Sequence, residues 1–207
     1  QALVQKSYSE PYITFDTNVS GAVNLLEAVR NLDTLRSLVF VTSDKVYKNK
    51  EWLWGYREND ELGGHDPYSA SKAAAELIFN SYQNSFFTEK DGFGASTARA
   101  GNVIGGGDFS AGRIVPDCIR AFQKNSEVMI RNPLSTRPWQ HVLEPLSGYL
   151  TLANSLIENP EISGAWNFGP DSENVRTVQE LTELAISILG SGSLKIDQKK
   201  LQPHEAN

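Results

Sequence analysis

Apolar and polar residues recur along the chain with the periods of alternating helices and strands. Between Asn18 and Asn31 the apolar residues follow the spacing of an amphipathic helix. The run Ser37–Thr42 comes next, and its strand-forming residues show no polar alternation. A strand that is apolar on both faces is typical of a parallel sheet covered on both sides. The pattern therefore predicts an α/β fold.

A second helix is indicated after a loop rich in glycine and charge, residues 48–64. Asp66 has the residue type of an N-cap, and Pro67 suits the first helical position. We expect the following residues to give this helix one apolar face: Ala75, Phe79, Tyr82 and Phe86.

The glycine-rich loop 101–108, which follows a predicted strand over 94–100, is where we expect the domain to change. Residues 1–101 are assigned to one domain. Residues 102–207 are assigned mainly to a second, smaller domain, with some segments returning to the first. Further elements are predicted as helices over 114–122 and 146–156, a strand over 165–168, and a helix with a capping box, Thr177 to Glu180, that ends before Gly190.

Composition narrows the class of protein. Of the 207 residues, 40% are hydrophobic and 21% are charged, which indicates a globular chain with a substantial core. The single cysteine, Cys118, excludes an internal disulfide, and no apolar run of membrane-spanning length or basic-apolar leader occurs. We therefore expect a cytoplasmic protein that does not enter a membrane. The net charge of −6 disfavours nucleic acid as a partner.

Tyr68 and Lys72 are separated by four residues on the predicted helix, so they share one face. A tyrosine that acts as a base must ionise near neutral pH, and an adjacent ammonium favours the phenolate. Lowering the phenol pKa from about 10 to about 7 requires roughly 4 kcal/mol. This is plausible for a desolvated pair, whereas the alternative is an exposed pair on the helix surface.

Ser43, Asp44 and Lys45 come directly after the first predicted strand. Open parallel sheets bind ligands at the carboxyl ends of their strands, which makes these polar residues candidates for a site. The alternative is that Ser43 and Asp44 only cap a turn. Combined with Tyr68 and Lys72 on the next helix, however, the hydroxyl of Ser43 is placed to converge with phenol and ammonium on one carbinol.

These motifs, in this order and spacing, resemble the extended short-chain dehydrogenase/reductases, and among them the nucleotide-sugar 4,6-dehydratases. The resemblance extends over essentially the whole chain. It implies a partial Rossmann-like parallel sheet with helices on both faces, plus a smaller α/β substrate-binding domain. The segments that carry it are Asn18–Gly21, Leu25–Ala28, Thr42–Tyr47, Tyr68–Lys72, Arg99–Asp108, Arg137–Val142 and Trp166–Gly169.

The resemblance implies an internal redox cycle with NAD. Tyr68 takes the proton of the sugar C4 hydroxyl, Ser43 hydrogen-bonds that oxygen, and Lys72 holds the cofactor ribose and the phenolate. Asp44 is the acid that protonates the C6 hydroxyl as water leaves. Lys45 is either the base that removes the C5 proton or a cation that stabilises the enolate, and the sequence does not choose between them.

For the substrate, the resemblance implies that Asn102 and Arg137 contact the pyrophosphate, with Arg113 a weaker candidate. The alternatives are a turn residue for Asn102 and a stacked surface residue for Arg137. His141 and His204 lack partners at metal-ligand spacing, so no metal is expected. The family also suggests a homodimer or higher homo-oligomer through the helices that begin near Asn18 and Asp66.

The triplet Ser43 to Lys45 resembles the branch of the family that acts on CDP-glucose, whereas the dTDP-glucose branch has Thr-Asp-Glu there. Two alternatives remain open. A nucleotide-sugar 4-epimerase also needs Ser43, Tyr68 and Lys72 but has no use for Asp44 and Lys45. A non-catalytic nucleotide-binding scaffold is favoured if the tyrosine and lysine are exposed or turned apart.

The family's glycine-rich dinucleotide motif does not occur near the start of the chain, and both ends look cut relative to the family. The pyrophosphate of NAD binds at that motif and at the helix that follows it. We therefore expect that these 207 residues alone are inactive or poorly soluble, with apolar strands exposed along one edge of the sheet.

Overall fold

A computed structural model gives the fold and describes residues 1–171, 174–190 and 192–197. His204 lies outside the described residues. The chain divides into two compact units. The first consists of Gln1–Gly101 and Leu143–Phe168, and the second consists of Asn102–Val142 and the described residues after Phe168.

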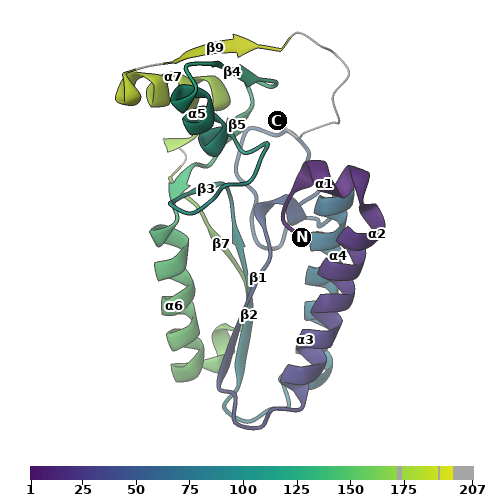
Figure 1. Cartoon of the computed structure of the whole chain (residues 1–207). Helices are drawn as coiled ribbons and strands as arrows, with labels where there is room; N and C mark the ends of the chain where they lie inside the picture. The colour runs from purple at the N-terminus through teal and green to yellow at the C-terminus, as the bar shows by residue number, and fades with distance from the viewer. Residues whose placement is uncertain (172–173, 191, 198–207) are drawn as a thin grey trace. The chain divides into compact units, whose positions relative to one another are not determined.

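The first unit is built on a parallel sheet of three strands, in the order β1-β2-β7 (Figure 1). These strands are β1 (Ser37–Val41), β2 (Gly94–Ala100) and β7 (Gly164–Phe168). Within the described residues, β1 and β7 each pair only with β2 and are the outer strands. The predicted α/β class with a parallel, Rossmann-like sheet is confirmed.

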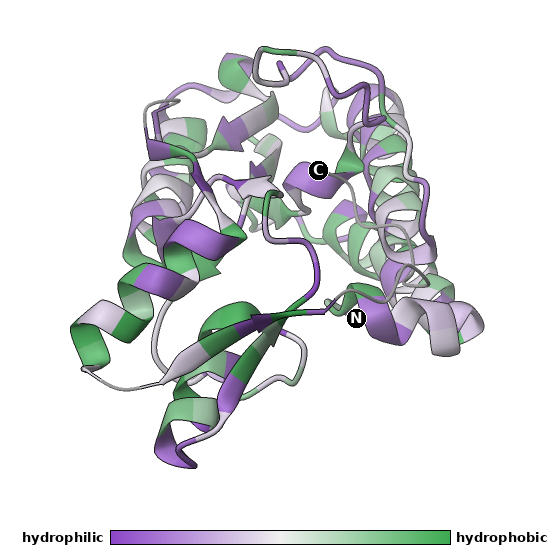
Figure 2. Cartoon of the chain, turned by 90° about the horizontal axis from the view of Figure 1, so that it is seen from above, coloured by the Kyte–Doolittle hydropathy of each residue, from purple (hydrophilic) through white to green (hydrophobic). Residues whose placement is uncertain are grey.

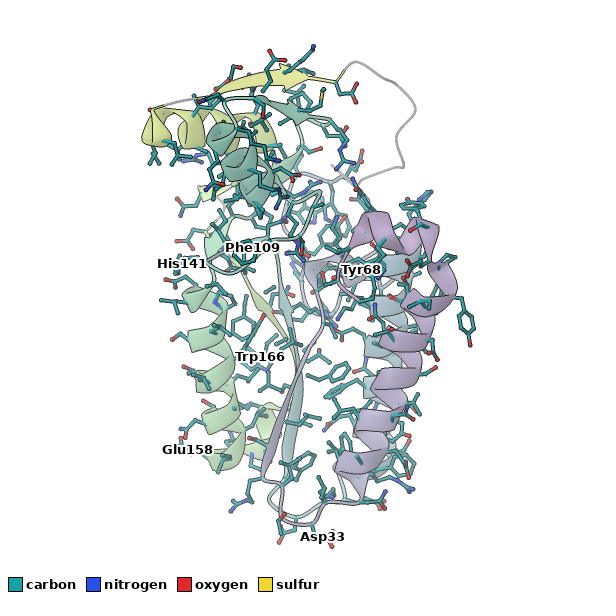
Figure 3. All side chains as sticks on the ribbon, viewed as in Figure 1. Asp33, Tyr68, Phe109, His141, Glu158 and Trp166 are labelled. Atoms are coloured by element: carbon teal, nitrogen blue, oxygen red, sulfur yellow. The ribbon has the colours of Figure 1, made fainter. Side chains whose placement is uncertain are left out.

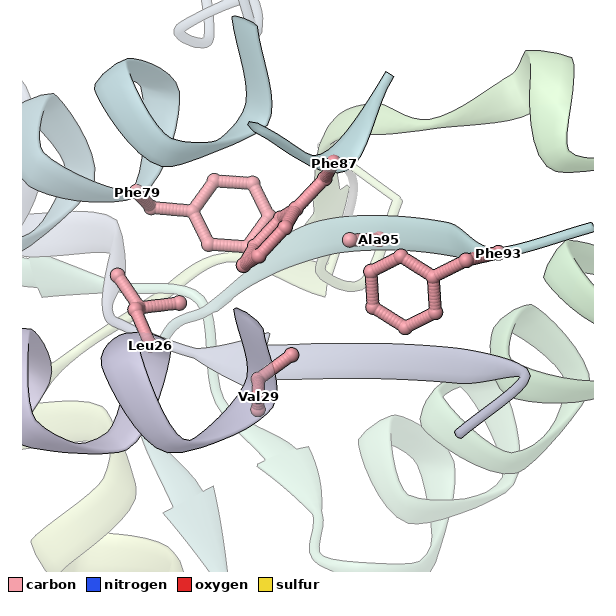
Figure 4. Packing of buried hydrophobic residues seen from close by; sticks show 6 residues of the cluster. All are labelled: Leu26, Val29, Phe79, Phe87, Phe93 and Ala95. Atoms are coloured by element: carbon pink, nitrogen blue, oxygen red, sulfur yellow. The ribbon is translucent and has the colours of Figure 1, made fainter. Parts of the chain in front are cut away.

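Helices cover both faces of this sheet (Figure 1). On one face, α3 (Gly21–Arg30) and α4 (Pro67–Tyr82) bury their apolar sides. On the other face, α6 (Leu143–Glu158) contacts β1 and β2. Gly148 of α6 lies against Phe168, and a Cβ there would lie 2.4 Å from the ring, so a larger residue would push the helix away. The cluster on the first face is drawn in Figure 4: Leu26, Val29, Phe79, Phe87, Phe93 and Ala95.

Helical structure begins earlier than the sequence pattern indicates. Two short helices, α1 (Val4–Ser9) and α2 (Pro11–Phe15), and a π-helical turn over Asp16–Ser20 (η1) precede α3. Pro11 stands at the first position of α2, where the missing N–H costs nothing. The helices carry both hydrophobic and hydrophilic residues along their length, as amphipathic helices do (Figure 2).

The prediction of the apolar face of α4 is wrong at its last residue, Phe86. After Tyr82 the helix continues as a π-helical turn, η3 (Gln83–Phe87). A π turn takes up one residue more than an α turn, so the inward position moves one residue along the chain. Phe87 is therefore buried, at 1% exposure, whereas Phe86 is 38% exposed.

The second unit has its own small core. The helices α5 (Ile114–Gln123) and α7 (Val178–Leu189) pack against the parallel pair β4 (Glu127–Ile130) and β9 (Ser193–Ile196). The capping box of α7 is formed as predicted, and Gly190 ends the helix in the left-handed conformation. The remaining strands are two-residue pairs: β3 (Val103–Ile104) with β6 (Gln140–His141), and β5 (Thr136–Arg137) with β8 (Arg176–Thr177).

Candidate active site

Tyr68, which is labelled in Figure 3, lies in the first turn of α4. Lys72 follows one turn later on the same helix. The start of the helix is fixed by Asp66, whose carboxylate accepts hydrogen bonds from the backbone N–H of Ser69 at 3.0 Å and from its hydroxyl at 2.6 Å. Tyr68 is buried, at 8% exposure. The tyrosine and lysine are therefore not the exposed surface pair that the alternative required.

Lys72 is partly buried and stands one helical turn after Tyr68 on α4. Burial lowers the pKa of its ammonium, and the carboxylate of Glu76, one turn further along α4, opposes that shift. The lysine therefore carries a charge that is costly to bury.

Ser43 stands between strand β1 and a short 3-10 helix, η2 (Asp44–Val46). Its Oγ donates a hydrogen bond to Oδ1 of Asp44 at 3.0 Å and accepts one from the backbone N–H of Lys45 at 3.2 Å. Ser43 is buried, and Asp44 and Lys45 are partly buried. Ser43 thus caps the turn, as the structural alternative held, and its hydroxyl also lies at the carboxyl end of a strand.

The segment after β1 packs directly against α4. Val46 and Tyr47 form a buried cluster with Ala73, the residue that follows Lys72. Gly64 closes the same region: a Cβ there would lie 2.2 Å from the backbone of the first turn of α4, so only glycine allows this approach. The structure therefore brings the Ser43–Lys45 segment onto the helix of Tyr68 and Lys72.

Two charged residues that the sequence analysis did not select lie inside the first unit. Glu76 of α4 and Arg99 of β2 form an ion pair of 2.8 Å, with side chains 0% and 2% exposed. The signal was present, since Glu76 interrupts an otherwise apolar stretch and Arg99 interrupts a buried strand. Charged side chains are almost never fully buried unless they are paired.

The three residues expected at the substrate belong to the second unit. The backbone oxygen of Asn102 accepts a hydrogen bond from the N–H of Gln140 at 3.1 Å. Arg113 pairs with Asp108 at 3.4 Å, and both side chains are partly exposed. Arg137 is partly buried on β5 and donates to the backbone oxygen of Thr136 at 2.7 Å. The structure thus holds Arg137 on a strand and Arg113 in an ion pair.

Among residues 1–171, 174–190 and 192–197, no three His, Cys, Asp or Glu side chains are grouped so that they could hold a metal ion. Nor does any helix in this part of the chain combine the length and apolar character needed to cross a membrane.

The chain is similar in sequence to known nucleotide-sugar enzymes. The chain is 48% identical to CDP-glucose 4,6-dehydratase of Salmonella typhimurium, over 100% of its own length and 59% of that protein. It is 26% identical to CDP-paratose 2-epimerase of Salmonella typhi, over 89% of the chain and 59% of that protein. The chain therefore spans about three fifths of the length of these curated relatives.

Solved structures show the same fold. The dTDP-glucose 4,6-dehydratase of Bacillus anthracis, in complex with NAD, superposes with a TM-score of 0.77 at 25% identity, covering 93% of this chain and 58% of that one. The UDP-glucose 4-epimerase of Thermus thermophilus, also with NAD, gives 0.80 at 23% identity, covering 94% and 61%, and at that identity it speaks for the fold alone. The model of the GDP-mannose 4,6 dehydratase family matches residues 1–205, and the chain belongs to that family.

Proposed function

We propose that the protein is a CDP-glucose 4,6-dehydratase, which converts CDP-glucose to CDP-4-keto-6-deoxyglucose and water. The observation that carries the proposal is the packing of η2, which contains Asp44 and Lys45, against α4, the helix of the buried Tyr68 and the partly buried Lys72. The 48% identity to a CDP-glucose 4,6-dehydratase over the whole chain supports the substrate.

NAD is the cofactor we propose, and the residues fit it. The ammonium of Lys72 is a donor suited to ribose hydroxyls, and in the proposed mechanism its charge stabilises the phenolate form of Tyr68. Held there, NAD would supply the hydride acceptor for oxidation at C4 of the sugar and the hydride donor for the later reduction at C6. Tyr68 removes the C4 hydroxyl proton, while Ser43 turns its hydroxyl from Asp44 to the C4 oxygen.

The elimination step falls to the two residues after Ser43. The 4-ketone acidifies the C5 hydrogen, so that Lys45 either removes the C5 proton or stabilises the resulting enolate. Asp44 gives its proton to the C6 hydroxyl, which leaves as water, and a proton is restored to C5 when C6 is reduced. A 4-epimerase needs no such acid and base, and for this reason the dehydratase is the better reading of Asp44 and Lys45.

The second unit is proposed to bind the nucleotide. Arg137 offers a planar guanidinium for bidentate contact with the diphosphate, and Asn102 offers an amide. Arg113 must exchange its bond to Asp108 for one to phosphate, which makes it the weaker of the three candidates.

Two further proposals concern NAD binding by these 207 residues alone and the oligomeric state of the protein. These 207 residues contain no glycine-rich dinucleotide motif near Gln1, so we expect them to bind NAD poorly when expressed alone. Titration of the chain with NAD in a calorimeter tests this, and binding at micromolar concentration would contradict it.

We also propose a homodimer through the outward sides of α2, α3 and α4, where apolar residues are exposed: Tyr12, Ile13, Leu25 and Leu77. Light scattering gives its mass.

The function is tested on the full-length protein. It is incubated with CDP-glucose and NAD, and the 4-keto-6-deoxy product is followed by its alkaline absorbance and by mass. Lys45→Ala is expected to lose turnover, whereas Lys48→Ala, which removes an exposed lysine paired with Glu61, keeps it. Interconversion at C4 without loss of water would identify an epimerase, and no reaction would favour a scaffold.

A further inference from the structure

The buried carboxylate of Glu76 receives four hydrogen bonds. Arg99 binds it through one edge of its guanidinium, with Nε donating to Oε1 at 2.9 Å and Nη2 donating to Oε2 at 2.8 Å. The hydroxyl of Thr42 donates to Oε1 at 2.5 Å, and that of Thr97 donates to Oε2 at 2.9 Å. All four residues are buried. The carboxylate therefore ties together α4, the end of β1 and the middle of β2.

Thr42, which binds Glu76, and Glu76 itself stand close in sequence to the candidate catalytic residues. Thr42 is the residue before Ser43, and Glu76 stands one helical turn after Lys72. The bond from Thr42 to Glu76 thus joins the two halves of the candidate active site through a single carboxylate. A purely structural core does not need this, because replacing a buried ion pair by apolar residues is often neutral or stabilising.

The other side of Arg99 holds the far end of the same segment. Its Nη1 donates to the hydroxyl of Tyr47 at 2.8 Å and to the backbone oxygen of Glu58 at 2.9 Å. The hydroxyl of Tyr47 donates in turn to Oδ1 of Asn167 on β7 at 2.6 Å. The residues from Ser43 to Val46 are therefore fixed at both ends, by Thr42 before them and Tyr47 after them.

We propose that the Glu76–Arg99 pair is a positioning device, which holds Ser43, Asp44 and Lys45 at a fixed place relative to Tyr68 and Lys72. The inference rests on the proposed function. In this role Glu76 and Arg99 act through the residues to which they are hydrogen-bonded, Thr42 and Tyr47. Because a shift of about 1 Å in a catalytic group costs about 10²-fold in rate, a loosened clamp lowers kcat while nucleotide binding persists.

A matched pair of variants tests the device. Thr42→Val and Thr97→Val each remove one hydroxyl donor from the same carboxylate, but only Thr42 is joined to Ser43. We expect Thr42→Val to lower kcat about 10- to 100-fold with KM for CDP-glucose unchanged, and Thr97→Val to lose similar stability but much less of kcat. Thr42→Ser, which restores the donor, should recover most of the rate.

Tyr47→Phe examines the other end of the segment and leaves Thr42 untouched. It should also lower kcat without raising KM, while Glu27→Gln, at an exposed ion pair on α3, keeps the wild-type rate. Equal kcat values for Thr42→Val and Thr97→Val, or a loss confined to KM, would overturn the positioning role and leave the proposed function standing. Absence of product from the wild-type protein would overturn the proposed function, and the role of the pair with it.

Discussion

Arg99→Met is the substitution whose effect on stability follows most directly from the structure. Methionine preserves much of the side-chain volume but removes both hydrogen bonds to the carboxylate of Glu76. The carboxylate is then left with the two threonine hydroxyls, in a site where neither partner was more than 2% exposed. Breaking a buried pair by removing one partner costs about 3–5 kcal/mol, because the other charge stays buried.

For a chain of this length each kcal/mol lowers Tm by about 2–4 °C, so the expected fall is about 6–20 °C. Thermal melts followed by circular dichroism measure it. Arg30→Met is the control, since Arg30 pairs with Glu27 at the surface of α3 and its loss should shift Tm within the scatter of replicate melts. Equal Tm values for the two variants would refute the reasoning that burial makes the Glu76–Arg99 pair costly to break.

Three further outcomes are expected. Gly64→Ala places a Cβ 2.2 Å from the backbone of the first turn of α4 and should lower the free energy of unfolding, measured by denaturant titration, by about 1–3 kcal/mol. Gly21→Ala is the control: its Cβ would have nothing within 4 Å, so the free energy of unfolding should stay the same or rise. Lys72→Met should abolish turnover and raise Tm at pH 7. Burial lowers the pKa of this lysine, so its charge destabilises the folded protein at neutral pH, and this cost vanishes as the pH rises toward 10.5, where thermal melts of the variant and the wild type should converge. Arg137→Lys should raise KM for CDP-glucose about tenfold with little change in kcat, because a point charge cannot replace a bidentate contact; an unchanged KM in steady-state assays would remove Arg137 from the site.

Elements with strong local signals were predictable from the sequence. β1 and α4 follow from an unbroken apolar run and from the Asp66 cap, and the capping box placed the start of α7. The β4–β9 pair was missed because its two strands lie far apart in the sequence and only their pairing makes them strands. Phe86 was misplaced because the periodic pattern assumes α-helical turns, and η3 is a π turn.

Motifs selected Ser43, Tyr68 and Lys72, and the structure shows their positions at the end of β1 and in the first turns of α4, while their catalytic roles stay predictions. The buried hydrogen-bonded residues behind them could not be predicted from the sequence. Glu76 and Arg99 come from separate elements and meet only once β1, β2 and α4 are assembled, so no spacing rule relates them. Thr42 and Thr97 look like ordinary strand residues until the carboxylate they share is visible.

The first unit is discontinuous, and this constrains how it forms during synthesis. Its chain leaves at Gly101 and returns only at Leu143. Until α6 and β7 have emerged from the ribosome, one face of the β1–β2 pair has no helix of this unit to cover it. The candidate catalytic residues are all made earlier, before Ala73, whereas Asn167, which accepts a hydrogen bond from Tyr47, is made last. We therefore expect an aggregation-prone interval between the two events, in which a nascent chain stalled near Val142 depends on chaperones.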